Sequence, residues 1–357
     1  MSDSRPKVLI VCNKHVHDVY LRPDDLDRLA TFAEWEWLPS EGGQGFAPNE
    51  DPAAVQLLLA RVGEVDGVVV CHGAPRIDGS VLERAPRLKV VGELEGDRFA
   101  YRIDTEAAWR RRVKTLDTTN GSSYPVAEWA LALALISLRN AGEQFRHMIS
   151  HEAYRRPTSD FGYVHAELYG KKVGLIGCGH IGRRLIQFLK SFACDVRVHD
   201  PYIPKEIPDA LDFLQTSLDS VLSNSDVVIC LAPLTPATLG MIGKRELDLL
   251  PSGAVFVNVS RGAIVDSDAL VERLGRKDIV AGLDVFDPEP IPANHPIKDL
   301  PNVFLSPHLA GVTAATREAF FTLMVDELDR FFHGHETRYD LLPRTLANRQ
   351  GEPPPGR

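Results

Sequence analysis

The chain has 357 residues, which is enough for two domains of ordinary size. Apolar residues make up 44% and charged residues 25% of it, as is typical of a globular protein, and the net charge of −9 disfavours a nucleic-acid partner. The five cysteines are scattered without a C-x-x-C pair, so we expect no metal site and reduced thiols in the cytoplasm. We expect no signal peptide and no membrane partner, because the longest apolar run, residues 127–138, is too short to cross a bilayer.

Short apolar runs alternate with helical patterns from the start of the chain. Strands are predicted at residues 7–12, 66–71, 88–92 and 113–116, and helices at residues 24–32, 52–62, 77–84 and 104–112. This alternation is typical of a doubly wound α/β domain with a parallel sheet. A long helical pattern follows over residues 125–150, with Pro125 in its first turn.

The same alternation continues through the second half of the chain. Strands are predicted at residues 172–176, 194–199, 226–231, 254–259, 279–284 and 303–306, and a helix at residues 181–192. A last long helical pattern covers residues 313–333 and has no predicted strand after it. The end of the chain is rich in proline and glycine, and we expect it to be disordered.

A glycine motif lies between the first two of these later strands and opens a helical pattern. Its residues are Gly177, Cys178, Gly179, His180, Ile181 and Gly182. Gly177 permits a tight turn, Gly179 lets the backbone approach a pyrophosphate, and Gly182 lets helix and strand pack closely. The start of the helix offers N–H groups to the phosphates. The motif therefore predicts a dinucleotide-binding site.

Asp200 ends the strand that follows this helix, where a dinucleotide-binding unit carries an acidic residue. Its carboxylate would accept hydrogen bonds from the adenosine ribose and would repel a 2′-phosphate. No arginine or lysine occurs at residues 201–203. We therefore expect NAD rather than NADP.

Three charged or titratable side chains follow three of the later strands. Arg261, Glu289 and His308 come after the strands at residues 254–259, 279–284 and 303–306. Ligands of open α/β sheets collect at the carboxyl ends of strands, and an arginine there offers a planar fork to a carboxylate. Each residue alone has an ordinary structural explanation, but the combination favours a hydride-transfer site. Asp287 competes with Glu289 as the partner of His308.

The chain resembles the D-isomer-specific 2-hydroxyacid dehydrogenase family over nearly its full length. The motifs that carry the resemblance are residues 177–182 with Asp200, residues 231–238, residues 259–262, residues 282–286 with Glu289, and residues 306–308. The resemblance implies a Rossmann NAD domain, residues 124–311, inserted into a flavodoxin-like substrate domain, residues 1–123 plus 312–345. Residues 346–357 would form a disordered tail. It also implies a cytoplasmic homodimer joined through the NAD domain.

The resemblance further implies that the protein uses NAD to interconvert a D-2-hydroxy acid and its 2-oxo acid. His308 would be the acid and base, Glu289 would hold its imidazole and stabilise the charged form, and Arg261 would bind the substrate carboxylate. The cofactor cleft would be lined by Ala232, Pro233, Thr238, Val259 and Ser260, with Asp284 near the nicotinamide.

The segment after the strand at residues 88–92 departs from the family, which has a short glycine-rich loop there. The substrate-side residues are predicted to be His72, Gly73, Glu95 and Gly96. The segment also carries acids at positions 93, 95 and 97. They could pair with Arg98 or Arg102 or be solvated, or they could select a substrate with a cationic or hydroxyl-rich tail. Both readings stay open.

Two other functions remain compatible with the motifs. Corepressors of this fold bind NAD and recognise peptides without catalysis, although the arginine, glutamate and histidine together favour an enzyme. The same three residues could also oxidise an inorganic oxyanion such as phosphite.

Overall fold

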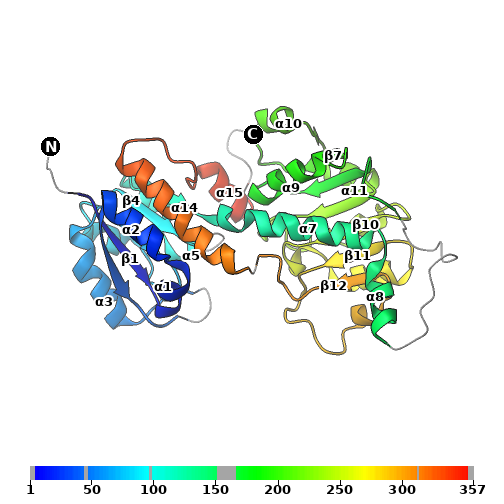
Figure 1. Ribbon diagram of the computed structural model, residues 1–357, viewed down its shortest axis with the longest axis horizontal. Coiled ribbons are helices and arrows are strands. Elements are labelled where there is room, and N and C mark those ends of the chain that lie inside the picture. The colour runs from blue at the N-terminus through cyan, green and yellow to red at the C-terminus, as the bar shows by residue number, and fades with distance from the viewer. Residues whose placement is uncertain (1–4, 44–46, 96–98, 151–165, 312, 353–357) are drawn as a thin grey trace. The chain divides into compact units, whose positions relative to one another are not determined.

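The computed structural model describes residues 5–43, 47–95, 99–150, 166–311 and 313–352 (Figure 1). The chain divides into two compact units. Unit 1 comprises Met1–Ser122 and Ala314–Leu342, and unit 2 comprises Ser123–Thr313 and Pro343–Arg357. None of the helices in the described part of the chain is long and apolar enough to cross a membrane.

Unit 1 is built on a five-stranded parallel sheet. Its strands are β1 (Lys7–Cys12), β2 (Glu34–Pro39), β3 (Gly67–Val70), β4 (Val90–Glu93) and β5 (Lys114–Asp117). Their order is β2-β1-β3-β4-β5, which is the order of a flavodoxin-like doubly wound sheet. This unit has the fold class that the sequence predicts for the substrate domain.

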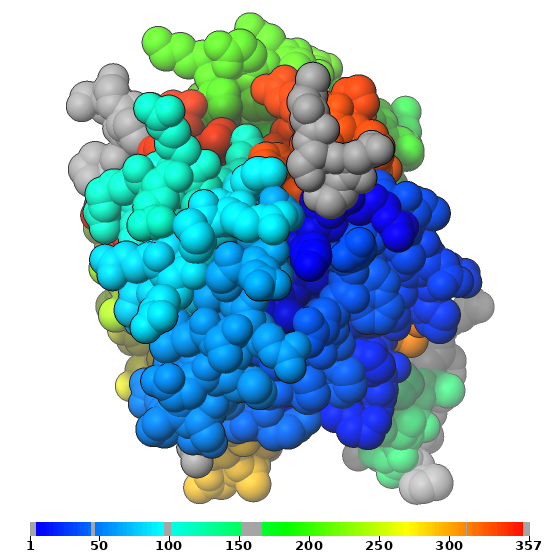
Figure 2. All heavy atoms as spheres, turned by 90° about the vertical axis from the view of Figure 1, so that its left-hand side faces the viewer, coloured from blue at the N-terminus to red at the C-terminus, as the bar shows by residue number. Residues whose placement is uncertain are grey.

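The helices of unit 1 include one that comes from far along the chain. They are α1 (Lys14–Tyr20), α2 (Pro23–Phe32), α3 (Pro52–Arg61), α4 (Gly79–Arg84), α5 (Phe99–Arg102), α6 (Thr105–Arg110) and α14 (Ala314–Phe332), with the short 3-10 turns η1 (Val62–Glu64) and η2 (Thr119–Ser122). Helix α14 lies beside α2 in Figure 1 and buries Phe321 and Met324 in the core of the unit. A Cβ added at Gly92 would lie 2.4 Å from Met324 Cε, so the Met324 side chain packs directly over this position of β4. The N-terminal part of the unit, blue to cyan, forms the face seen in Figure 2.

Unit 2 is built on a seven-stranded parallel sheet. Its strands are β6 (Lys172–Ile176), β7 (Asp195–His199), β8 (Leu214–Gln215), β9 (Val227–Cys230), β10 (Val255–Asn258), β11 (Val280–Leu283) and β12 (Val303–Leu305). Their order is β12-β11-β10-β9-β6-β7-β8, so the direction of winding reverses between β6 and β9. This is the Rossmann arrangement, in which ligands bind beyond the strand ends at the point of reversal.

Helices cover both faces of this sheet. They are α7 (Ser123–Ser137), α8 (Ala141–Ile149), α9 (His180–Lys190), α10 (Glu206–Leu211), α11 (Leu218–Ser223), α12 (Lys244–Asp248), α13 (Ser267–Gly275) and α15 (Pro343–Gln350), with the 3-10 turns η3 (Gly262–Ile264) and η4 (Pro296–Asp299). Leu175 and Val257 face a core shared with α7 and α9. Val228 and Phe256 face a second core shared with α11, α12 and α13. Burial on both faces explains why the central strands β9 and β10 are runs of apolar residues.

The structure differs from the predicted elements in several places, and three of these differences have a clear physical cause. The helical pattern at residues 125–150 breaks into α7 and α8 at Asn140, which adopts a left-handed φ of +44° that asparagine tolerates. Strand β2 was not predicted, because it is an edge strand whose exposed positions carry charged residues. Residues 343–350 form α15, with Leu346 buried, so the ordered chain extends beyond residue 345, where we expected a disordered tail. Residues 353–357 of that tail lie outside the described residues.

Candidate active site

The glycine motif forms a tight turn between β6 and α9. Gly177 has a φ of +100°, and a Cβ added there would lie 2.8 Å from Ala232 N. A Cβ added at Gly182 would lie 2.8 Å from Gly177 O, so α9 could not approach the turn with a larger residue there. Apart from Gly179 itself and its two chain neighbours, no described residue has an atom within 4 Å of a Cβ added at Gly179, which is the N-cap of α9. The turn therefore leaves open space beside the helix N-terminus, and this space fits a pyrophosphate.

Asp200 follows β7 and is joined to the glycine turn by hydrogen bonds. Its carboxylate accepts from Cys178 N at 2.8 Å and from Tyr202 N at 2.8 Å. These backbone donors hold the carboxylate in one orientation at the end of β7. Cys178 itself is buried, which raises the pKa of its thiol to about 12 and makes it unreactive at neutral pH.

The residues predicted to line the cofactor cleft follow β9 and β10, and hydrogen bonds connect the two loops. The Thr238 hydroxyl donates to Pro233 O at 2.6 Å and accepts from Thr235 N at 2.8 Å. The Ser260 hydroxyl donates to Ala232 O, so the end of β10 is joined to the end of β9. Val259 and Ser260 are both buried. The contacts of these residues with NAD stay predictions.

Arg261 directly follows this pair at the end of β10. Its Nη1 donates to Ser260 O at 2.7 Å, and its own carbonyl accepts from Asn258 Nδ2 at 3.1 Å. A Cβ added at the next residue, Gly262, would lie 1.9 Å from the carbonyl carbon of Phe286. Only glycine permits this close approach, which keeps the loop after β10 against the loop after β11.

His308 and Glu289 form the second part of the site. Nδ1 of His308 is hydrogen-bonded to Oε1 of Glu289, and both side chains remain partly exposed. The structure thus pairs His308 with the carboxylate of Glu289 and not with that of Asp287. A carboxylate on Nδ1 leaves Nε2 as the ring nitrogen for proton exchange with a substrate.

Asp284 lies beneath the loop that carries His308. Its carboxylate is fully buried and accepts from Ser306 Oγ at 2.6 Å, Leu309 N at 3.0 Å and Ala310 N at 2.9 Å. These are donors from the chain itself, so the geometry gives Asp284 a structural task. The predicted proximity of Asp284 to the nicotinamide remains a prediction.

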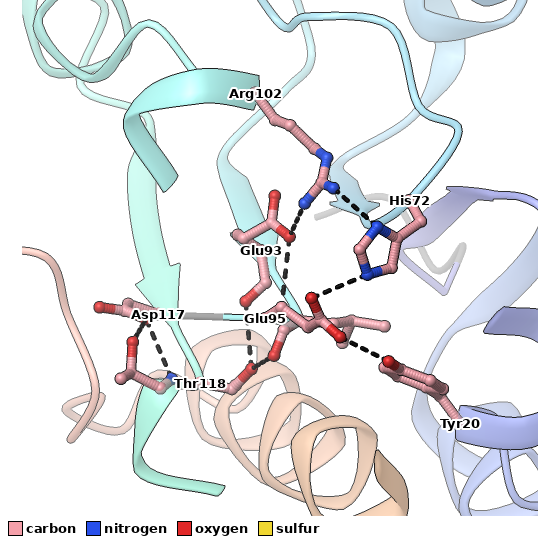
Figure 3. A network of polar contacts seen from close by, with 9 residues as sticks. Tyr20, His72, Glu93, Glu95, Arg102, Asp117 and Thr118 are labelled. Carbon is pink, nitrogen blue, oxygen red and sulfur yellow. Dashed lines mark hydrogen bonds and ion pairs between the residues drawn. The ribbon is translucent and has the colours of Figure 1, made fainter. Parts of the chain in front are cut away.

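The acids of the unusual segment in unit 1 are paired, and Figure 3 shows their network. Arg102 Nη1 donates to Glu93 Oε1 at 2.6 Å, and both side chains are fully buried. His72 Nε2 lies 2.8 Å from Glu95 Oε2, and the Tyr20 hydroxyl donates to Glu95 Oε1. Glu93 is therefore paired with Arg102, one of the two expected partners, whereas Glu95 is held by His72 and Tyr20 and not by an arginine. Residues 96–98, which include the predicted Gly96, lie outside the described residues.

The network also sets protonation states. Burial raises the pKa of Glu93 to about 8, although Arg102 opposes this. Burial acts on Glu95 too, but the hydrogen bonds and charge of His72 and the hydrogen bond of Tyr20 outweigh it and lower the pKa of Glu95. Arg102 Nη2 lies 3.2 Å from His72 Nδ1 and has only protons to give, so a neutral His72 carries its proton on Nε2. Glu95 therefore remains ionised at neutral pH.

Gly73, also predicted on the substrate side, has a clear structural reason to be glycine. It has a φ of +87°, and an added Cβ would lie 2.0 Å from Ser40 O. Its carbonyl accepts from Ser40 Oγ at 2.7 Å. Tyr20 was not foreseen, because α1 has no clear signal in the sequence.

The buried pair of Glu93 and Arg102 gives a pH-dependent prediction for stability. At about pH 9, where Glu93 is ionised in the natural protein, Arg102→Met should lower the free energy of unfolding by about 3–5 kcal/mol, because the buried carboxyl of Glu93 loses its partner. The pKa of Glu93 rises from 4.5 to about 8 on folding, so stability falls as the pH rises between these values and then levels off. In Arg102→Met, Glu93 stays protonated to higher pH, so the free energy of unfolding continues to fall above pH 8. Thermal unfolding followed by circular dichroism at about pH 6 and about pH 9 should show a larger loss at the higher pH.

Arg110→Met is the matched control, because Arg110 forms an exposed pair with Glu106 at 3.7 Å. It should change stability little and equally at both pH values. An equal loss at both pH values in Arg102→Met would contradict the assigned state of Glu93.

The turn, the acid and the charged strand ends define a class of protein, a nucleotide-dependent dehydrogenase of two α/β units. Residues 131–310 match the family model described as D-isomer specific 2-hydroxyacid dehydrogenase, NAD binding domain. A glyoxylate reductase from Thermococcus gammatolerans is 33% identical over 307 residues, which cover 85% of this chain and 89% of that protein. The chain therefore belongs to the D-isomer-specific 2-hydroxyacid dehydrogenase family and is an NAD-dependent oxidoreductase.

Two further comparisons describe the range of relatives. A D-3-phosphoglycerate dehydrogenase from Methanocaldococcus jannaschii is 32% identical over 279 residues, or 78% of this chain, and the chain spans only 52% of that longer protein. A crystal structure of a Pyrococcus horikoshii protein is 26% identical, with a TM-score of 0.74 and coverage of 96% of each chain. The shared fold thus extends over both units.

Proposed function

We propose that the protein interconverts a D-2-hydroxy acid and its 2-oxo acid, with His308, Glu289 and Arg261 as its catalytic residues. The observation that carries the proposal is their placement after three neighbouring strands, since β10, β11 and β12 lie side by side in the sheet. Bound NADH would supply the hydride for reduction of the oxo acid.

Each residue has a distinct task in this proposal. The Arg261 guanidinium binds the substrate carboxylate and polarises the carbonyl beside it. His308 gives a proton to the carbonyl oxygen during reduction and takes it back during oxidation. Glu289 orients the imidazole through Nδ1 and stabilises its charged form. Side chains of adjacent loops thus exchange the proton, bind the carboxylate and polarise the carbonyl.

We assign His72, Gly73, Glu95 and Gly96 to the part of the substrate beyond its carboxylate. Glu95 is ionised, and its carboxylate is held by His72 and Tyr20. A second anionic group on the substrate would meet this charge, which favours small, neutral, hydroxylated or amine-bearing oxo acids. The proposal thus favours a substrate like glyoxylate, named for one relative, over a phosphorylated one, named for the other.

The cofactor preference rests on Asp200, which we propose accepts hydrogen bonds from the adenosine ribose. NADH should support turnover far better than NADPH, because the fixed carboxylate would repel a 2′-phosphate. Asp200→Ala should narrow this difference in kcat/KM. Asp219→Ala is the control, because Asp219 is an exposed acid paired with Arg245 and should leave the preference unchanged. Equal use of both cofactors by the natural protein would overturn the assignment.

A panel of 2-oxo acids assayed with NADH tests the reaction itself. Turnover of neutral or amine-bearing oxo acids, with poor turnover of 3-phosphohydroxypyruvate and 2-oxoglutarate, is the expected result. Binding of NADH without turnover of any oxo acid would favour a non-catalytic NAD sensor. Reduction of NAD by phosphite would favour oxidation of an inorganic oxyanion.

We also propose that the protein is a cytoplasmic homodimer joined through unit 2. Helix α8 exposes three large apolar side chains, with Phe145 at 61%, Met148 at 59% and Ile149 at 59% exposure, and a second copy would cover them. The five cysteines are free, which suits a reducing compartment. Sedimentation should show a dimer that Phe145→Glu weakens, and a monomer in the natural protein would refute the proposal.

A further inference from the structure

The loop that carries His308 is connected to α7 by two consecutive side-chain hydrogen bonds. Trp129, on α7, donates its indole N–H to Ser306 Oγ at 3.1 Å. The Ser306 hydroxyl in turn donates to Asp284 Oδ1 at 2.6 Å. Ser306 and Asp284 are buried, whereas Trp129 is only partly buried. The sequence gives no reason to connect these three residues, which lie in distant parts of the chain.

His308 needs support of this kind because its backbone is strained. Its φ of +51° is in the left-handed region, which a residue with a side chain rarely adopts. Its N–H donates to Asp284 O at 2.8 Å, while the N–H groups of Leu309 and Ala310 donate to the Asp284 carboxylate. Asp284 thus accepts hydrogen bonds from Ser306 before His308 in the chain, from Leu309 and Ala310 after it, and from His308 itself.

The hydrogen bond from Trp129 complements the one that Ser306 donates to Asp284. Ser306 Oγ accepts from the indole N–H and donates its own proton to the Asp284 carboxylate, so both side chains fix the position of the hydroxyl. Helix α7 is itself firmly placed, since Ala127, Ala130 and Leu133 are fully buried in the core of unit 2. The indole therefore connects the strained loop to one of the best-packed helices of the unit.

We propose that Trp129 is a positioning residue that acts through Ser306 and Asp284 to hold His308 in its left-handed conformation beside Glu289. The inference rests on the proposed function, in which His308 exchanges a proton with the substrate. A loop that loses this connection samples other backbone conformations, and the imidazole leaves its productive orientation for part of the time. Such a change lowers the rate of the chemical step more than it lowers cofactor binding.

Trp129→Phe tests this directly, because phenylalanine keeps an aromatic ring and removes the N–H. We expect kcat for the best oxo acid of the panel to fall by roughly 10-fold, with the dissociation constant of NADH unchanged. The fall of reductase activity with rising pH should begin at lower pH, because an imidazolium held less firmly to Glu289 is less stabilised. A merely structural role for Trp129 would move neither kcat at saturation nor the pH profile.

Trp109→Phe is the matched control. Trp109, on α6 in unit 1, also donates its indole N–H to a hydroxyl, Thr115 Oγ1, at 3.0 Å. Both variants should lose similar thermal stability, but only Trp129→Phe should change kcat and the pH profile. Identical kinetics of the two variants would overturn the proposal.

Ser306 provides a second test that does not depend on the tolerance for phenylalanine at position 129. Ser306→Ala should lower kcat as Trp129→Phe does. Ser306→Thr should keep kcat near that of the natural protein, because threonine keeps the hydroxyl. In a His308→Ala background, Trp129→Phe should cause no further loss, since the residue that it positions is gone. A loss that persists in that background would refute the positioning role. If His308→Ala itself retains full activity, the catalytic role proposed for His308 fails instead, and the two failures are thereby distinguished.

Discussion

Replacing His308 by alanine is expected to lower kcat for reduction of a 2-oxo acid by about 10²–10⁴-fold, the usual contribution of a positioned proton donor. The dissociation constant of NADH should change little, because the imidazole exchanges a proton with the substrate. Steady-state kinetics and fluorescence titration with NADH measure the two quantities separately. His333→Ala is the matched control, since the His333 imidazole also contacts a carboxylate, that of Asp329, but directly follows α14 in unit 1. Near-normal reduction by His308→Ala would show that the proton comes from another group.

Glu289→Gln extends this test to the partner of the imidazole. Glutamine can still hold Nδ1 by a hydrogen bond but has no charge to stabilise an imidazolium. Reduction, which needs the protonated ring, should therefore decline at lower pH than in the natural protein. An unchanged pH profile would mean that Glu289 only orients the ring.

Arg261→Ala is the second large effect that we expect, with a loss of about 10²–10³-fold in kcat/KM. KM should rise and kcat should fall together, because the same guanidinium binds the carboxylate in the ground state and polarises the carbonyl in the transition state. Arg261→Lys should restore little, since an ammonium cannot reproduce the planar fork. Steady-state kinetics with the best oxo acid of the panel measure both constants.

A matched control for the arginine lies on α12. Arg245 is an exposed arginine that pairs with Asp219 and Glu246, and Arg245→Ala should leave kcat and KM unchanged. A rise in KM without any loss of kcat in Arg261→Ala would restrict this residue to substrate binding. An unchanged kcat/KM in Arg261→Ala would show that Arg261 neither binds the substrate nor takes part in catalysis.

The elements of the fold that could be predicted are those whose pattern is local. The buried strands are short apolar runs, and ten of the twelve strands in the described part of the chain lie where such runs occur. The two that were missed, β2 and β8, are edge strands with exposed residues. They are not buried on both faces and therefore do not appear as apolar runs in the sequence. The break between α7 and α8 also escaped prediction, because Asn140 differs from its neighbours only in tolerating a left-handed backbone.

The candidate site also has parts that a local pattern predicts and parts that depend on how the chain folds. The glycine turn and the aspartate after β7 are recognisable because strand, turn, helix and acid follow one another within about thirty residues of a βαβ unit. The choice of Glu289 over Asp287 as the partner of His308 depends on how the loop after β11 folds, which residue spacing alone left open. The pairing of Arg102 with Glu93 likewise depends on where α5 brings the arginine relative to the end of β4.

By itself, the sequence determined the class of fold, the nucleotide turn and the strand ends that carry charged residues, because local periodicity and parallel strand order are enough to place them. Only the tertiary structure decided which side chains meet. The hydrogen bonds from Trp129 to Ser306 and from Ser306 to Asp284 join α7, β12 and β11, which are separated by up to 177 positions in the chain. Such contacts arise when the helices pack on the sheet, and no pattern within one segment records them.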